Sequence, residues 1–173
     1  MSYLPEGCAQ PDADELDAFW ASCSQTHGLA NSEYQVRWIG LDYDSTEDVL
    51  QLISVGDKTG TFTLPWIVEQ TDIPMPASGD CIILINYAGH PRLLLQLTDI
   101  QQVDFGAITA HHTAVDGTPV RDLAIWKPLH TQYWNDLLAP FGKSVSDDMP
   151  VLIEKFNLLS HYLRCEFDTE RAV

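Results

Sequence analysis

The chain has few positive charges and no long apolar segment. Its 173 residues contain 9 Lys and Arg against 25 Asp and Glu, which gives a formal net charge of −16. A field of that sign repels long nucleic acids and anionic membrane surfaces. The longest aliphatic runs, CIILI (81–85) and LLLQL (93–97), are much shorter than the ~18 apolar residues that suggest a transmembrane helix. Long nucleic acids are therefore disfavoured as partners, and no membrane association is expected.

Metal-binding and redox cysteine motifs are also missing. The cysteines at 8, 23, 81 and 165 form no C-x-x-C motif and have no zinc-ribbon spacing. Cys23 falls on the apolar face of a helical pattern and Cys81 opens an apolar run, so both are predicted to be buried and reduced. Residues 1–17 are acidic and lack a basic segment followed by an apolar core, so no signal peptide is expected. These features favour a cytoplasmic protein.

Apolar periodicity predicts a helix near the N-terminus and a second one after it. Leu16, Phe19 and Cys23 recur at helical spacing behind the acidic segment PDADE, and HG at 27–28 ends this helix. The second helix is expected to begin at a cap formed by Ser45 or Thr46 and to end at the glycine of SVG.

Most of the remaining elements are predicted to be strands. The candidate strands are TGTFTLPWIV (59–68), CIILIN (81–86), RLLLQLTDIQQV (92–103) and VLIEKFNLL (151–159). A short helix is expected in AITAHHTAV (107–115) and a longer one after a cap at Asp122. Early helices followed by antiparallel strands predict an α+β fold, in which the last strand closes a small barrel with helices packed around it. The predicted organisation is an N-terminal extension (1–15), a single domain (16–163) and a C-terminal tail (164–173).

The histidines do not form a metal motif. His111 and His112 are adjacent, and adjacent side chains usually point in different directions; no H-x-x-x-H spacing is present, so no metal is expected. His130 shares a helical face with Trp126 and Trp134, which is compatible with a core histidine or with a more specific role. No G-x-S-x-G elbow or Cys–His signature is present, and no cofactor is expected.

The segment VGDKTGTFTL (55–64) carries the most informative polar residues. It is not a P-loop, because that motif lies between a strand and a helix whereas here a helix precedes the lysine. Lys58 and Thr61 can face one cavity, and a desolvated amine or a carboxylate can take the proton of a threonine hydroxyl. The residues alone leave three interpretations open: a structural turn, a ligand-binding loop and a catalytic pair.

Three segments in this order resemble the ASCH family, a PUA-like β-barrel domain. They are DVLQLISVGDKTGTFT (48–63), PMPASGDCIILINYAGHPRLLLQLTDIQQVDFGAIT (74–109) and DGTPVRDLAIWKPLHTQYW (116–134). The similarity is greatest to a bacterial branch with G-x-K-T-x-T and W-x-x-x-H motifs. It implies an α+β fold, a small PUA-like (ASCH) β-barrel with flanking helices, and a cleft beside the G-x-K loop.

The resemblance also implies a class of ligand. The family is associated with RNA or nucleotide-like ligands, and some bacterial members are amidohydrolases that act on an acetylated cytidine. Their proposed catalytic lysine, threonine and glutamate correspond to Lys58, Thr61 and, nearest the acidic position, Asp116. Relatives tend to carry E-G-E-G where this chain has DGTP, so Asp116 is one methylene shorter and Thr118 replaces the second glutamate. Because small misplacements of a catalytic group lower rates strongly, this change favours binding over hydrolysis.

The predicted function is therefore a cleft that binds a nucleobase- or nucleoside-like small molecule or an RNA end. One alternative is an amidohydrolase acting on an acylated nucleoside through Lys58 and Thr61 with an acidic partner. Another is a protein-interaction domain without a small ligand. A homo-oligomer is compatible with the sequence. Besides Lys58, Thr61 and Asp116, the residues predicted to contact the ligand are Thr59, Trp66, Arg92, Trp126 and His130.

Overall fold

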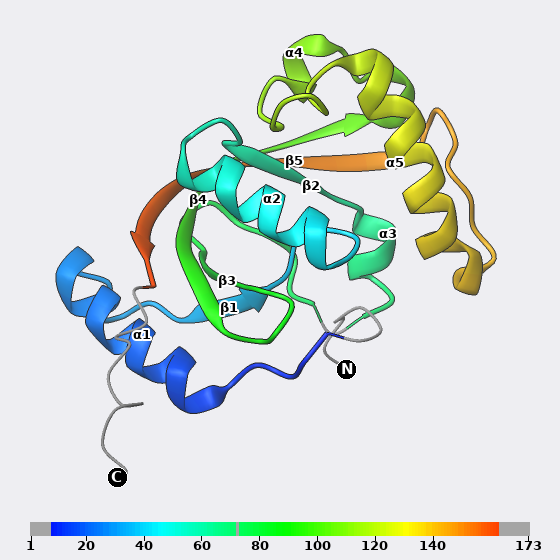
Figure 1. The fold of residues 1–173 in the computed structure, drawn as a ribbon. Coiled ribbons are helices and arrows are strands. Elements are labelled where there is room, and N and C mark those ends of the chain that lie inside the picture. The colour runs from blue at the N-terminus through cyan, green and yellow to red at the C-terminus, as the bar shows by residue number, and fades with distance from the viewer. Residues whose placement is uncertain (1–7, 72, 163–173) are drawn as a thin grey trace, which may run out of the picture.

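The chain folds into a five-stranded sheet surrounded by helices, which confirms the α+β prediction (Figure 1). A computed structural model describes residues 8–71 and 73–162. The elements are α1 (Ala13–His27), β1 (Tyr34–Arg37), α2 (Tyr43–Ser54), β2 (Gly60–Thr63), α3 (Pro65–Val68), β3 (Cys81–Ile85), β4 (Pro91–Asp104), η1 (Phe105–Ala107), α4 (Ala110–Thr113), α5 (Leu123–Leu138), η2 (Ala139–Phe141) and β5 (Pro150–His161). None of the described helices is long and apolar enough to cross a membrane.

The sheet is strongly curved but open. Its strand order is β1-β3-β4-β5-β2, with β1 parallel to β3 and every other pair antiparallel. The prediction that the last strand closes a barrel is wrong, because β5 lies inside the sheet between β4 and β2 and leaves β1 and β2 as its edges. Register shifts in the β3–β4 and β4–β5 ladders allow the long strands to bend.

An ion pair shows how far the sheet curves. Arg37 of β1 donates from Nη1 to Glu154 Oε2 of β5 at 2.7 Å, although β3 and β4 lie between those strands. Three strand spacings in a flat sheet would separate the two backbones by ~14 Å. Curvature therefore brings the concave side of β1 towards that of β5.

Helices cover both faces of the central strands. On the concave face, Leu50 and Ile53 of α2 pack with Leu84, Leu95 and Phe156. On the other face, Leu16, Phe19 and Cys23 of α1 pack against β3 and β4, as the helical spacing of these three residues predicts. Cys23 and Cys81 are both buried in this cluster. Burial raises the pKa of both of these cysteine thiols.

A third cluster surrounds α5 at the other end of the molecule. Trp126, Trp134 and Leu138 are buried against Met149 and Val151 at the start of β5. In Figure 1, α4 and α5 lie beside the strand ends of β2 and β5. This cluster supports the loop that precedes α5, which carries part of the candidate site.

Several element boundaries differ from the prediction. Helix α2 begins at Tyr43 and is capped by Asp42, whose carboxylate accepts from Ser45 N at 2.9 Å. The predicted caps at Ser45 and Thr46 are therefore wrong, since both residues lie inside the first helical turn or directly after it. Gly56 does follow the helix in the left-handed conformation, with φ of 75°.

Some predicted domain limits fall at or beyond the described ends. Helix α1 starts at Ala13, so the expected boundary at residue 15 falls within this helix. Ala9 N and Asp12 N donate to Tyr87 O and Gly89 O, which places the segment before α1 against the β3–β4 turn. The expected tail at 164–173 lies outside the described residues.

Candidate functional site

The first element of the site is the turn that follows α2. Asp57 N and Lys58 N both donate to Leu52 O, at 2.9 and 3.1 Å, which directs the chain away from the helix axis. The Lys58 side chain is 5% exposed, and its Nζ lies 2.5 Å from Asp116 Oδ1. Asp116 Oδ1 also accepts from Gly117 N at 2.9 Å. The lysine and the aspartate that the sequence proposed as partners are therefore in direct contact.

The loop that carries Asp116 is joined to the α2–β2 loop at several points. Thr59 N donates to Val115 O at 2.8 Å, and Thr118 N donates to Asp57 Oδ2 at 2.7 Å. Arg121 Nη2 reaches both Asp57 O at 2.6 Å and Asp57 Oδ1 at 2.5 Å. The Thr118 N–H holds the pKa of Asp57 below its usual value, with a further contribution from Arg121. These bonds fix the relative position of the two loops.

Glycine is required where β2 begins. A Cβ at Gly60 would lie 2.7 Å from Val115 Cγ2 and 2.8 Å from Glu154 O. The absence of a side chain lets the loop after Lys58 pack directly on both neighbours.

His130 of α5 belongs to the same neighbourhood. Its ring stacks on Trp126 with centroids 4.0 Å apart, and its Nδ1 donates to Trp126 O at 2.9 Å. Burial lowers the His130 pKa to about 4; nearby Asp116 raises it and Lys58 lowers it. At neutral pH the imidazole is therefore uncharged, with its proton on Nδ1 and its Nε2 lone pair available as an acceptor.

Thr61 lies on the face of β2 opposite to that of Phe62 and His130. Phe62 lies 4.7 Å from Trp126 and 5.7 Å from His130 between ring centroids, and neighbouring residues of a strand point to opposite faces. Thr61 is instead paired with Glu154 across the β2–β5 ladder. Among the described residues, no hydrogen bond joins the Thr61 hydroxyl to Lys58 or Asp116. The predicted catalytic set is thus divided between two faces of β2.

Glu154 is a buried polar residue that sequence reasoning missed. It is fully buried, its Oε2 accepts from Arg37 Nη1, and its Oε1 has no hydrogen-bond partner among the described residues. The available signal was a lone acid inside the apolar strand VLIEKF. Its partner Arg37 is 117 residues away, and no local pattern joins the two.

The other predicted ligand residues are spread over the fold. Thr59 is exposed beside Lys58. Arg92 pairs with Glu47 early in α2, and the seven positions from Glu47 to the end of the helix at Ser54 correspond to ~10 Å of helix rise. Trp66 is half-buried under Lys143 Nζ, which lies 4.2 Å from the ring centroid.

Trp126 lies too deep to form an open wall. Its side chain is 0% exposed, and its ring packs among Phe62, Phe105, His130 and Trp134. It positions His130 from the core side. The structure thus brings together Lys58, Asp116 and His130, and Thr59 follows Lys58 in the chain.

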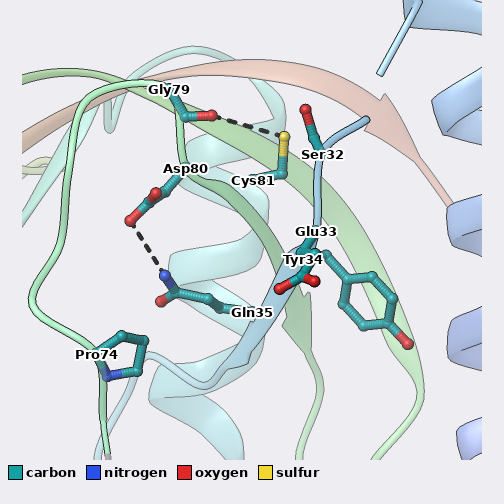
Figure 2. Close-up of a pocket in the computed structure, with 8 residues that line it drawn as sticks. All are labelled: Ser32, Glu33, Tyr34, Gln35, Pro74, Gly79, Asp80 and Cys81. Carbon is teal, nitrogen blue, oxygen red and sulfur yellow. Dashed lines mark hydrogen bonds between the residues drawn. The ribbon is translucent and has the colours of Figure 1, made fainter. Parts of the chain in front are cut away.

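A separate pocket lies at the start of β1 and β3 (Figure 2). Gln35 Nε2 donates to Asp80 Oδ2 at 3.1 Å within it. The pocket contains none of the predicted site residues; it is lined by Ser32, Glu33, Tyr34, Gln35, Pro74, Gly79, Asp80 and Cys81.

The described residues contain no group of three or more His, Cys, Asp or Glu that could hold a metal ion. His112, one of the two adjacent histidines, accepts at Nδ1 from Thr109 N at 3.0 Å and completes the cap of α4. This contact gives His112 a structural role.

The curved open sheet with a G-x-K loop held against the loop before α5 defines a PUA-like α+β domain. The ASCH domain family matches residues 37–160, and the chain belongs to this family. An ASCH domain from Lactobacillus crispatus JV V101 has a similar structure, with a TM-score of 0.78 at 17% identity over 86% of this chain and 96% of that one. A protein from Enterococcus faecalis V583 gives a TM-score of 0.79 at 18% identity over 87% of this chain and 91% of that one. No curated protein matches the chain.

Proposed function

We propose that this ASCH domain binds a nucleobase- or nucleoside-like small molecule at the Lys58–Asp116 pair. The observation that carries the proposal is a buried ammonium group held by one carboxylate beside an uncharged imidazole. Such an arrangement is a weak stabilising device, because desolvation of two charges offsets most of their attraction. Ionisable side chains that are buried close together are instead frequent at ligand and catalytic sites.

The three side chains offer complementary hydrogen-bonding groups. An ammonium group has three donors, and Asp116 is the sole hydrogen-bond partner of Lys58 Nζ among the described residues. His130 Nε2 supplies an acceptor. A nucleobase edge presents ring acceptors and N–H donors next to each other, which suits this combination.

The charge of the chain favours a small ligand over a long polymer. With a net charge of −16, few cations are available to neutralise successive phosphates. The cations Arg37, Lys58, Arg92 and Arg121 are each paired with a carboxylate in the described structure. An uncharged nucleoside avoids the repulsion that a polynucleotide would meet, and a single RNA end is the larger alternative ligand.

A thermal-shift screen tests this proposal. The panel contains cytidine, uridine, adenosine, guanosine, N4-acetylcytidine and cytidine monophosphate, against wild type, Lys58→Ala and the control Arg92→Ala. A ligand at 100 times its Kd adds ~2.7 kcal/mol to the free energy of unfolding, which raises Tm by about 5–10 °C for a chain of this size. The shift is expected in wild type and Arg92→Ala and not in Lys58→Ala. An equal shift in all three proteins would place the ligand elsewhere.

Amide hydrolysis is a second candidate, favoured by the direct contact between Lys58 Nζ and Asp116 Oδ1. A paired amine and carboxylate can exchange a proton with a reacting group. The test is chromatographic detection of cytidine and acetate released from N4-acetylcytidine. Release by wild type that is lost in Asp116→Asn supports hydrolysis, whereas binding without release leaves the domain as a binding module.

A further inference from the structure

The pocket at the start of β1 and β3 has the size of a small-molecule site (Figure 2). Its volume is about 440 Å³, and typical ligand pockets have ~300–1,000 Å³. Its walls come from two segments that are distant in the chain, with Gln35 on one and Asp80 on the other. Lys58, Asp116 and His130 are not among its described lining residues. The pocket is therefore separate from the site proposed above.

Gln35 and Asp80 are held in fixed positions at the pocket wall. Gln35 Oε1 accepts from Arg37 Nε at 3.3 Å and from Arg37 Nη2 at 2.9 Å, which directs the NH2 group of the same amide towards Asp80. Gln35 Nε2 donates to Asp80 Oδ2 at 3.1 Å, the bond drawn in Figure 2, and Ala77 N donates to the same oxygen at 2.9 Å. Arg37 is itself fixed by Glu154, whose Oε2 accepts from Nη1 at 2.7 Å. The Asp80 carboxylate is therefore positioned before any ligand binds.

Asp80 ends this network with a charge that no cation balances. Its two donors are neutral and both bind Oδ2, and no donor reaches Oδ1 among the residues that the structure describes. Arg37, the cation of the network, is paired with Glu154 instead. The described lining adds a second carboxylate, that of Glu33, and contains no Lys, Arg or His. A half-buried carboxylate in this position is best satisfied by a ligand that brings positive charge and N–H donors together.

We propose that this pocket binds a small organic cation, whose ammonium or guanidinium group donates to Asp80 Oδ1 while Glu33 supplies a second negative charge. The net charge of −16 concentrates cations at the surface of the protein, and the fixed carboxylate in the pocket selects those with N–H donors. A metal ion is a poorer fit, because the described residues offer no group of three ligating side chains. The volume of the pocket accommodates a short carbon chain beside Pro74. This site is independent of the proposed nucleoside function.

Isothermal titration with agmatine, which carries a guanidinium and an ammonium group, tests the proposal. Wild type is expected to bind it saturably at one site and not to bind the uncharged 1,4-butanediol. Asp80→Asn is expected to weaken agmatine at least ~10-fold, because the asparagine oxygen can keep the bonds from Gln35 and Ala77 while its NH2 group replaces Oδ1. Asp99→Asn removes the same charge from a carboxylate that is 57% exposed and paired with Lys155, and should change the affinity less than ~2-fold.

The two variants separate a specific site from general attraction to an acidic protein. A loss of affinity in Asp80→Asn together with an unchanged affinity in Asp99→Asn supports the proposal. Equal losses in both variants would show attraction by net charge alone and overturn it. The absence of saturable binding to wild type, or equal binding of 1,4-butanediol, would overturn it as well. Each of these outcomes leaves the proposed nucleoside site standing.

A measurement on wild type alone covers an Asp80 variant that does not fold. The side-chain NH2 resonances of Gln35 report on the pocket, since Gln35 Nε2 donates to Asp80 Oδ2. Agmatine is expected to shift them saturably and to leave those of Gln102, an exposed residue of β4, unchanged. Saturable binding without a shift at Gln35, or equal shifts at the two glutamines, would overturn the proposal.

Discussion

Replacing Lys58 with methionine should destabilise the protein strongly, because its ammonium group is buried against Asp116. Lys58 and Asp116 are 5% and 9% exposed at their side chains, so removal of the ammonium leaves a buried carboxylate that retains Gly117 N as its hydrogen-bond donor. Breaking one partner of a buried pair costs ~3–5 kcal/mol. For a chain of this length that loss lowers Tm by about 6–20 °C. Urea denaturation of the single variant measures it directly.

The double variant Lys58→Met/Asp116→Asn shows whether the cost of Lys58→Met comes from the unpaired buried charge of Asp116 or from other lost contacts of Lys58. It removes both charges and keeps an oxygen that accepts from Gly117 N, so we expect it to be more stable than Lys58→Met alone. The exposed Arg92–Glu47 pair is the matched control, because its side chains are 38% and 31% exposed and Arg92→Met should cost only ~0.2–1 kcal/mol. If Lys58→Met costs no more than Arg92→Met, or if the double variant shows no coupling, the buried-pair argument is wrong.

Three further changes test the surroundings of the site. The folded-state pKa of His130 is lowered to about 4, so the contribution of its neutral form to stability should be complete above pH ~6.5 and fall by up to ~3 kcal/mol as the pH drops to 4. A His130→Gln variant should lose this pH dependence in urea titrations at several pH values. A variant whose stability changes with pH as in wild type would contradict this prediction. Gly60→Ala should cost ~1–3 kcal/mol because its Cβ would meet Val115, and an unaltered denaturation midpoint would contradict the packing described. Trp126→Ala should cost ~3–5 kcal/mol and broaden the His130 NMR signals, whereas a cost below ~1 kcal/mol would mean that the ring is not a core element.

Local patterns in the sequence predict the elements whose stabilising contacts are also local. The spacing of Leu16, Phe19 and Cys23 identifies α1, since helical periodicity follows directly from which face is buried. The segment YAGHP identifies the β3–β4 hairpin, where Gly89 has a φ of 82°. The pairing of Lys58 with Asp116 followed from the ASCH resemblance and not from any local pattern.

Elements that depend on distant partners could not be predicted in the same way. The four residues of β1 were missed because they form a strand only through parallel pairing with β3, which begins more than forty residues later. In PWIV, Pro65 starts a short helix at the end of an apparent strand, as proline often does at a first helical position. Glu154 was missed because its partner is remote and its strand is otherwise apolar. The curvature that brings Arg37 to it is a property of the whole sheet.

The central claim is that a small ligand occupies the surroundings of Lys58, Asp116 and His130. The most direct measurement is a cytidine titration of the wild-type protein, followed through the Cε1–H resonance of His130 with exposed His27 as the internal reference. The account predicts a saturable shift at His130, no shift at His27, and loss of both binding and shift in Lys58→Ala. Saturable binding that leaves His130 unchanged would place the ligand elsewhere and contradict the account.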